Sequence, residues 1–274
     1  YFDINSGTVL NCLSVTHIGG AMQVIRALVY KLDLIVVTPS KSPFSIIIIP
    51  WEEVEILSLV PYQLDYLLTE IPYNLNQCKT ILLGGAPVSN TLKCKLVDVN
   101  LSNVYETYGM TETLSHIALK NTLKDNFFII LKGIKISTDT RGCLRITDTF
   151  LKLDNLNTND LVEIKDGKSF KWLGRYDNVI NTGGIKVITE EIEGKIKSLF
   201  PKNDFFIFSK DHATLGEEIN LVIKGVPFEI EKSVFSSVLK KYEVPKNIYF
   251  LEKFIRTSTQ KTLRKETIAQ LSFN

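Results

Sequence analysis

The stretch YETYGMTET, residues 105–113, follows an apolar run that predicts a strand. It contains two tyrosines, three threonines and two glutamates. A hydroxyl or carboxylate that is buried without a partner costs free energy, so we expect these side chains to face a ligand rather than a core. An aromatic ring can stack on a base, hydroxyls can hold phosphate oxygens, and a carboxylate can bind Mg²⁺. Taken alone, the stretch also fits a surface loop.

Upstream of this stretch, predicted strands alternate with predicted helices. Strand-like runs cover residues 8–14, 32–37, 54–60, 79–83 and 102–105, and helical stripes lie at 21–30, 64–68 and 92–97. Such alternation predicts a doubly wound α/β sheet, with residues 32–37 as a buried parallel strand. Ligands bind at the carboxyl ends of strands in these sheets. The turn Gly84-Gly85-Ala86-Pro87 and the stretch 107–113 both follow strands, so we expect a nucleotide there.

The pattern changes twice further along the chain. After residue 120, short strands separated by turns predict a small antiparallel sheet or barrel. Beyond residue 177 we expect a compact α+β unit with helices at 189–198, capped by Thr189, and at 229–240. The predicted domains are therefore residues 1–176, divided into an α/β part (1–120) and a β-rich part (121–176), and residues 177–274.

Composition narrows the classes of function. The 274 residues carry a net charge of +2, which gives no electrostatic reason to expect nucleic acid as a partner. Scattered cysteines (Cys12, Cys78, Cys94, Cys143) favour reduced thiols in the cytoplasm. No apolar run approaches the length of a membrane span, and residues 1–20 lack a signal peptide. The chain begins at Tyr1 rather than methionine, which favours a fragment. The sequence neither predicts nor excludes a homodimer.

Further polar clusters have both an ordinary and a functional interpretation. They are Thr158-Asn159-Asp160, residues 174–178, residues 180–186 and the basic segment 256–265. The ordinary interpretations are a turn aspartate, a surface salt bridge, a glycine hairpin turn and a solvated basic face. The functional ones are a carboxylate that binds ribose hydroxyls and a lysine that neutralises developing negative charge. His17 has the ordinary interpretation of a core histidine.

Together and in this order, the clusters resemble the adenylate-forming superfamily of acyl-CoA ligases, adenylation domains and luciferases. The resemblance runs from about residue 8 to the end and is carried by YETYGMTET, by TND at 158–160, by GRYDNVINTGGIKV at 174–187 and by RTSTQK at 256–261. It implies an AMP-forming acid–thiol ligase that uses ATP, Mg²⁺ and coenzyme A. It also implies a smaller, mobile α+β lid domain after a large α/β domain.

The resemblance assigns a role to individual residues of the predicted nucleotide site. Tyr108 would stack on adenine opposite the 84–87 turn, with Glu106, Thr107 and Gly109 beside it. The remaining assignments are Thr111 to the α-phosphate, Glu112 to Mg²⁺, Asp160 and Arg175 to the ribose, Asp177 to the hinge, Lys261 to the carboxylate and α-phosphate, and Gly184 and Lys186 to coenzyme A.

Several tracts are most similar to the o-succinylbenzoate–CoA ligases of menaquinone synthesis, among them HIGG (17–20) and IRALV (25–29). By that resemblance His17, Ser115 and His116 line the acyl pocket. Another aryl- or acyl-CoA ligase is the alternative. The family's lysine-bearing phosphate loop is expected before residue 1. Because the given residues do not include this loop, a non-catalytic nucleotide-binding protein is the second alternative. Gln260 stands where the family usually has glycine.

Overall fold

The computed structural model describes residues 2, 4, 6–44, 48–257 and 262–271. The chain forms two compact units. Unit 1 comprises Tyr1–Ile136, Ile146–Leu156 and Ile164–Lys171, and unit 2 comprises Ser137–Arg145, Asn157–Glu163 and Trp172–Asn274. Among the described residues, no helix is long and apolar enough to cross a membrane.

Unit 1 is built on a largely parallel sheet. Its strands are β1 (Thr8–Asn11), β2 (Asp33–Val36), β3 (Val54–Leu59), β4 (Thr80–Leu83), β5 (Val104–Gly109), β6 (His116–Asn121) and β7 (Phe128–Ile130). Its helices are α1 (Ile18–Tyr30), α2 (Pro61–Glu70), α3 (Pro72–Gln77) and α4 (Asn90–Asp98), with 3-10 turns η1 (Trp51–Glu53) and η2 (Thr111–Thr113). The strand order is β2-β1-β3-β4-β5-β6-β7, parallel up to β5 and antiparallel from β5 to β7.

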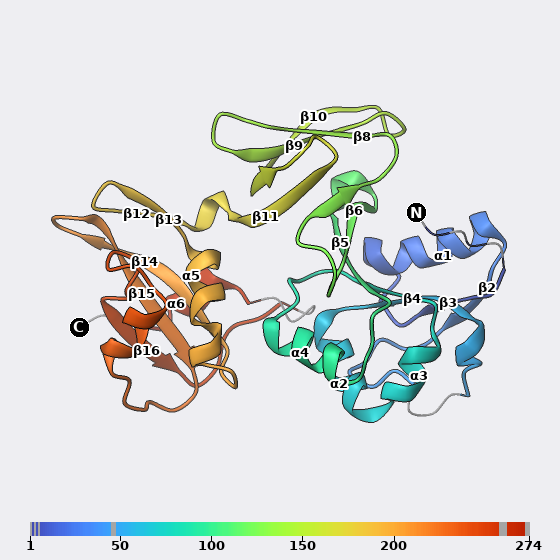
Figure 1. The fold of residues 1–274 in the computed structure, drawn as a ribbon, viewed down its shortest axis with the longest axis horizontal. Helices are drawn as coiled ribbons and strands as arrows, with labels where there is room; N and C mark the ends of the chain where they lie inside the picture. Colours follow the sequence, from blue (N-terminus) through green and yellow to red (C-terminus); the bar gives the residue numbers. More distant parts are fainter. Residues whose placement is uncertain (1, 3, 5, 45–47, 258–261, 272–274) are drawn as a thin grey trace. The chain divides into compact units, whose positions relative to one another are not determined.

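Helices cover both faces of this sheet (Figure 1). On one face, Leu64 of α2 and Leu96 of α4 pack in a core with Leu57 of β3. On the other face, Ala27 of α1 packs against Val9 of β1. All six residues of β3 are buried, because a central strand with helices on both sides has no solvent-facing side. The predicted doubly wound α/β arrangement is confirmed.

Two details of the prediction are wrong. Strand β2 is parallel, but it lies at the edge of the sheet and its residues are exposed or only partly buried. The apolar run predicted burial because hydropathy cannot show whether a strand has one neighbour or two. The stretch 105–113 is also not a loop throughout, since β5 extends to Gly109 and pairs with β6, a strand that the sequence pattern did not indicate.

The strand path of unit 1 continues from β7 to β11 through the pair Phe128–Phe170. The next strands in the path are β10, β9 and β8. Their bounds are β8 (Ile134–Thr138), β9 (Cys143–Asp148), β10 (Leu153–Ile164) and β11 (Ser169–Arg175). Because each of these strands contributes residues to both units, the division between the units runs within them.

The rest of unit 2 is an α+β structure. It contains η3 (Tyr176–Asn178), β12 (Val179–Thr182), β13 (Ile185–Ile188), α5 (Thr189–Ile196), η4 (Lys197–Leu199), β14 (Phe205–His212), β15 (Gly216–Lys224), η5 (Lys232–Ser237), β16 (Asn247–Leu251) and α6 (Arg264–Ile268). The sheet order is β13-β12-β15-β14, and β16 pairs with β15. Ile192 of α5, Leu221 of β15 and Phe235 of η5 share its core.

Two predictions for unit 2 are wrong as well. The helix expected at 229–240 is only the short 3-10 turn η5. Serines and β-branched valines in that segment are weak helix formers, and few of its side chains reach the core. Thr189 is not an N-cap: Ile188 occupies the cap, and Thr189 is the buried first residue of α5.

Candidate functional site

The parallel pairing of β4 with β5 places the 84–87 turn beside the polar stretch. Leu83 pairs with Glu106, and the Thr107 hydroxyl donates to the Leu83 carbonyl oxygen at 2.9 Å. A Cβ on Gly84 would lie 3.0 Å from the Thr107 hydroxyl, while Gly85 has a left-handed φ of +84°. The turn therefore needs its glycines for both close approach and backbone conformation. Its residues 85–87 are exposed.

Tyr108 is half-buried, and its ring is held by other aromatic rings. The ring edge contacts Phe170 at a centroid distance of 5.0 Å and Phe128 at 5.9 Å. Gly109 follows at an irregularity in the β5–β6 register, where a Cβ would lie 2.4 Å from the Ser115 carbonyl oxygen. Aromatic packing and the tight glycine therefore fix the direction in which the Tyr108 ring points.

The turn η2 presents two predicted ligand residues to solvent. The Thr113 hydroxyl accepts the Met110 N–H at 3.0 Å and donates to the Ser115 carbonyl oxygen at 2.8 Å. This buried hydroxyl stabilises the conformation of the turn, in which Thr111 and Glu112 are exposed. No group of three or more metal-binding side chains occurs among the described residues. A single exposed carboxylate fits a Mg²⁺ ion that nucleotide phosphates carry, because Mg²⁺ usually takes only one or two protein carboxylates.

The Glu106 side chain forms ion pairs with two lysines inside the protein. Its buried carboxylate lies 3.3 Å from the Lys120 Nζ and 3.8 Å from the Lys93 Nζ. Burial lowers the pKa of Lys120, and the charge of Glu106 opposes this shift. The ammonium of Lys120 also lies over the Phe128 ring. Nucleotide binding by Glu106 stays a prediction, and the carboxylate has a structural role that the sequence did not reveal.

A cavity of about 370 Å³ lies next to the end of the polar stretch, within unit 1. Its lining includes Met22, Ile25, Leu114, Ser115, His116 and Leu131. The Ser115 hydroxyl lies 3.5 Å from His116 Nδ1. Burial, followed by the positive charge of Arg26, lowers the pKa of His116 to about 4, so the imidazole is neutral near pH 7. His17 is exposed and does not line this cavity, so its place in the acyl pocket stays a prediction.

Arg26 is a candidate that sequence reasoning missed. It follows Ile25 on α1, is partly buried, and donates from Nη1 to Gln23 Oε1 at 2.7 Å. Burial lowers the pKa of Arg26, and its charge acts on His116. Arg26 is not among the residues that line the cavity, but its charge acts on His116, which is. The sequence feature that could have indicated Arg26 is its position as the single charged residue within the otherwise apolar tract 25–29.

In unit 2, the predicted ribose and hinge residues form one hydrogen-bonded group. Asp160 is buried on β10 and accepts Trp172 Nε1 at 3.2 Å and Arg175 Nη1 at 3.5 Å. Arg175 Nη2 also donates to Asp177 Oδ2 at 3.1 Å. Arg175 thus joins the two carboxylates, and Asp177 in η3 remains largely exposed.

The remaining predicted residues belong to a hairpin and a loop. Gly183 and Gly184, with φ of +57° and +81°, form the two-residue turn between β12 and β13, which suits paired glycines. Lys186 is exposed on β13. Lys261 and Gln260 lie outside the described residues.

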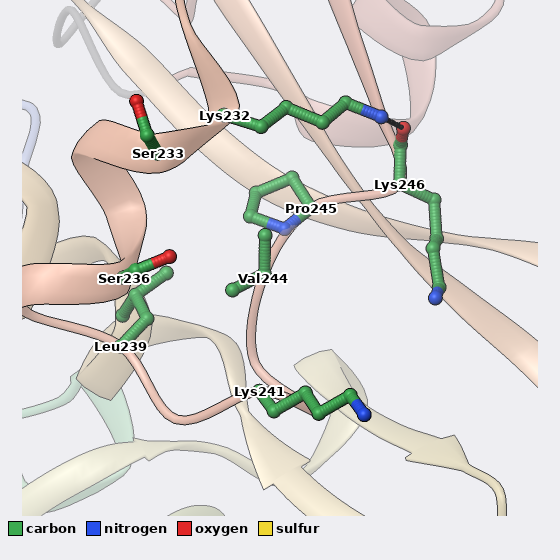
Figure 2. A pocket seen from close by; sticks show the side chains of 8 residues that line it. All are labelled: Lys232, Ser233, Ser236, Leu239, Lys241, Val244, Pro245 and Lys246. Atoms are coloured by element: carbon green, nitrogen blue, oxygen red, sulfur yellow. Dashed lines mark hydrogen bonds between the residues drawn. The ribbon is translucent and has the colours of Figure 1, made fainter.

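A second cavity, of about 540 Å³, lies in unit 2 and contains none of the predicted site residues (Figure 2). Three lysines and two serines contribute to its lining: Lys232, Lys241, Lys246, Ser233 and Ser236. Lys232 Nζ already donates to the Lys246 carbonyl oxygen at 2.7 Å. Figure 2 shows the ammonium groups of Lys241 and Lys246 apart from the serine hydroxyls. The cations and hydroxyls therefore do not converge on one point.

Fold and sequence together define the class: the chain belongs to the family of AMP-binding, adenylate-forming enzymes. The model of the AMP-binding enzyme family matches residues 2–130. A solved structure from Dyadobacter fermentans, described as an acyl-CoA synthetase (AMP-forming)/AMP-acid ligase II-like protein, is 34% identical. That match covers 97% of this chain and 79% of the other, with a TM-score of 0.59.

Some relatives are named for one particular acid substrate. The 2-succinylbenzoate–CoA ligase of Bacillus cytotoxicus is 26% identical over 94% of this chain and 60% of its own length. The o-succinylbenzoate coenzyme A synthetase of Bacillus subtilis, solved in complex with ATP and magnesium ion, has a TM-score of 0.81 at 22% identity, covering 95% of this chain and 61% of the other. This likeness shows the fold. The chain spans about 60% of the length of these relatives.

Proposed function

We propose that this protein is an ATP-dependent acid–CoA ligase that forms an acyl-adenylate and then a CoA thioester, with o-succinylbenzoate as the acid. The observation that carries the substrate choice is the largely apolar cavity lined by the half-buried, neutral His116, on which the charge of Arg26 acts. Family membership and the relatives named 2-succinylbenzoate–CoA ligase support the reaction class.

The first half-reaction brings two anions together, the acid's carboxylate and the α-phosphate of ATP. Catalysis therefore needs alignment and positive charge more than covalent chemistry. In this proposal Tyr108 stacks on adenine against the 84–87 turn, and Asp160 accepts the ribose hydroxyls. Thr111 contacts the α-phosphate and Glu112 holds Mg²⁺, in keeping with their exposure on η2. Lys261 supplies the remaining positive charge.

The acyl cavity favours an aromatic acid that carries a second carboxylate. The apolar side chains of Met22 and Ile25 suit a ring. Arg26 would bind the carboxylate that does not react, which would compensate the cost of keeping a cation partly buried. A fatty acid offers no such anion and would leave the arginine without this charge partner. The neutral His116 accepts or donates hydrogen bonds without adding charge.

The second half-reaction needs the thiol of coenzyme A at the position that we propose for Lys261 in the first half-reaction. In the proposal, Asp177 is the hinge about which the smaller domain turns. Gly184 and Lys186, exposed on the β12–β13 hairpin, then face coenzyme A. An exposed residue such as Asp177 suits a position where backbone dihedrals change.

The test is release of pyrophosphate by the natural protein with a panel of acids. We expect release with o-succinylbenzoate and little with benzoate or fatty acids. Arg26→Met is expected to lower kcat/KM for o-succinylbenzoate by about 10- to 150-fold, the range for a hydrogen bond to a charged group. The same variant should change the rate with benzoate little, and Arg145→Met serves as the control.

The outcomes separate the alternatives. Release with fatty acids but not with o-succinylbenzoate would refute the substrate and leave another acyl-CoA ligase. ATP binding without release for any acid would refute the ligase proposal and favour a nucleotide-binding protein without catalysis. Equal losses for o-succinylbenzoate and benzoate in Arg26→Met would refute the role of Arg26.

A further inference from the structure

Three exposed apolar side chains gather at the cavity of unit 1 that we propose for the acid. Phe150, Leu114 and Ile25 line this cavity, yet they are 72%, 49% and 46% exposed. Single exposed apolar residues are ordinary, but apolar side chains grouped around one cavity mark a binding surface. They come from three distant segments, the β9–β10 turn, the end of η2 and helix α1, so the fold brings them together.

Leu114 is held in a conformation that leucine rarely adopts. Its φ of +55° and ψ of −32° suit glycine, because a side chain crowds the backbone there. Hydrogen bonds on both sides impose this conformation. The Leu114 N–H donates to the Thr111 carbonyl oxygen at 3.0 Å, and the Ser115 N–H donates to the Thr113 carbonyl oxygen at 2.6 Å. Such strain clusters at ligand-binding sites, so it points to a role for the leucine side chain in the cavity.

The β9–β10 turn, residues 149–152, fixes the position of the Phe150 ring. The buried Asp148 carboxylate accepts the N–H groups of Phe150 and of the next residue, at 2.8 and 3.1 Å. The Thr149 hydroxyl donates to the Gly133 carbonyl oxygen at 3.0 Å. A Cβ on Gly133 would collide with the Phe150 ring, so the ring packs directly on the Gly133 backbone. These contacts orient the ring although most of it is open to solvent.

We infer that Phe150 and Leu114 form an apolar wall that binds the ring of the acid and selects aromatic acids over acids with a saturated ring of similar size. The inference rests on the proposed function, since it specifies the acid for the same cavity. Contacts between aromatic rings stabilise binding beyond the burial of apolar area. Of the charged lining residues, Lys132 is a cation that suits an acid, and Asp148 already accepts two N–H groups of the turn.

The experiment compares two acids that differ only in the ring. They are o-succinylbenzoate and its counterpart with a cyclohexane ring, which carries the same carboxylates and the same ketone. Binding of each acid to the natural protein is measured by titration calorimetry, and kcat/KM is measured by pyrophosphate release. The unaltered protein should prefer the aromatic acid by about 10-fold in both measurements, the upper part of the range for a pair of aromatic rings.

Phe150→Leu keeps an apolar side chain but removes the aromatic face. It should reduce the preference to about 2-fold or less, mainly by weakening the binding of the aromatic acid. Tyr73→Leu is the matched control, because Tyr73 on α3 is 75% exposed and is not among the residues that line the cavity. This control variant should keep the full preference.

Leu114→Gly removes the side chain and relieves the backbone. We expect its midpoint of unfolding in denaturant to be unchanged or higher, while its affinity for both acids falls by about 10-fold. A leucine that only supported the fold would give the opposite result, which is lower stability with unchanged affinity.

Three results would overturn the inference: a preference that Phe150→Leu leaves unchanged, equal affinity of the unaltered protein for the two acids, or binding of neither acid. The proposed function fails in a different way. In that case the unaltered protein binds the aromatic acid but releases no pyrophosphate with any acid, and the ratio of the two affinities still tests the apolar wall.

Discussion

At the scale of single residues, buried charge distinguishes the two ends of the polar stretch. Glu106 at its start is neutralised by Lys120 and Lys93. His116 just beyond its end is kept neutral by burial and by the charge of Arg26. The stretch therefore supplies a structural ion pair on β5, and His116 beyond it supplies an uncharged polar wall of the cavity, while the exposed Glu112 between them is available to solvent.

His116 should make the protein less stable in mild acid. Its pKa is about 4 in the folded protein, below the ordinary value of about 6.5 that the unfolded chain has. Between these values the unfolded state binds more protons, so the free energy of unfolding falls as the pH drops from about 6.5 towards 4. We expect a loss of about 1–3 kcal/mol from this group.

The check is denaturant unfolding of the protein and of His116→Asn at pH 7 and pH 5. The variant should lose less stability between the two pH values than the unaltered protein. His17→Asn, at an exposed histidine, should keep the original pH dependence. An unchanged pH dependence in His116→Asn would show that other groups cause the acid sensitivity.

At the scale of elements, the start of helix α1 depends on one glycine. The helix follows a tight turn, and a Cβ on Gly20 would lie 2.3 Å from the Ser14 carbonyl oxygen. A Cβ on Gly19 would meet only the Leu13 side chain at an ordinary 3.6 Å. Neighbouring glycines of one helix therefore differ sharply in their tolerance of a side chain. Because α1 carries Met22 and Ile25, its position also sets the shape of the cavity that these residues line.

Gly20→Ala should lower the free energy of unfolding by about 1–3 kcal/mol, as overpacking against backbone does. It should also raise KM for the acid, because a displaced α1 moves the cavity wall. Gly19→Ala is the matched control and should be neutral or stabilising by up to about 1 kcal/mol, since alanine favours helix. Unfolding curves and acid titrations measure both effects. Equal destabilisation by the two variants would contradict the close approach at Gly20.

At the scale of the whole molecule, each unit has a core of its own. Leu57, fully buried in β3, belongs to the core beneath α2 and α4. Phe235, fully buried in η5, belongs to the core of unit 2. The two described clusters share no residue. Local stability should therefore respond separately in the two units.

Leu57→Ala should destabilise unit 1 by about 2–5 kcal/mol through lost contacts and a cavity. Hydrogen exchange of backbone amides should then accelerate in β1, β3 and β4 and stay unchanged in β14 and β15. Phe235→Ala should give the reverse pattern. Equal acceleration in both sheets for either variant would mean that the two cores unfold together.

The sequence by itself determined the α/β alternation, the glycine turns and the order of the motifs, because a period of two or 3.6 residues and a left-handed turn are local properties. Family membership followed from that order. The tertiary structure alone decided which partners meet. Arg26 acts on His116 across 90 residues and Arg264 meets Glu193 across 71, and neither pairing leaves a local pattern. Burial decides the rest: whether Glu106 faces a ligand or two lysines depends on packing that no local sequence pattern records.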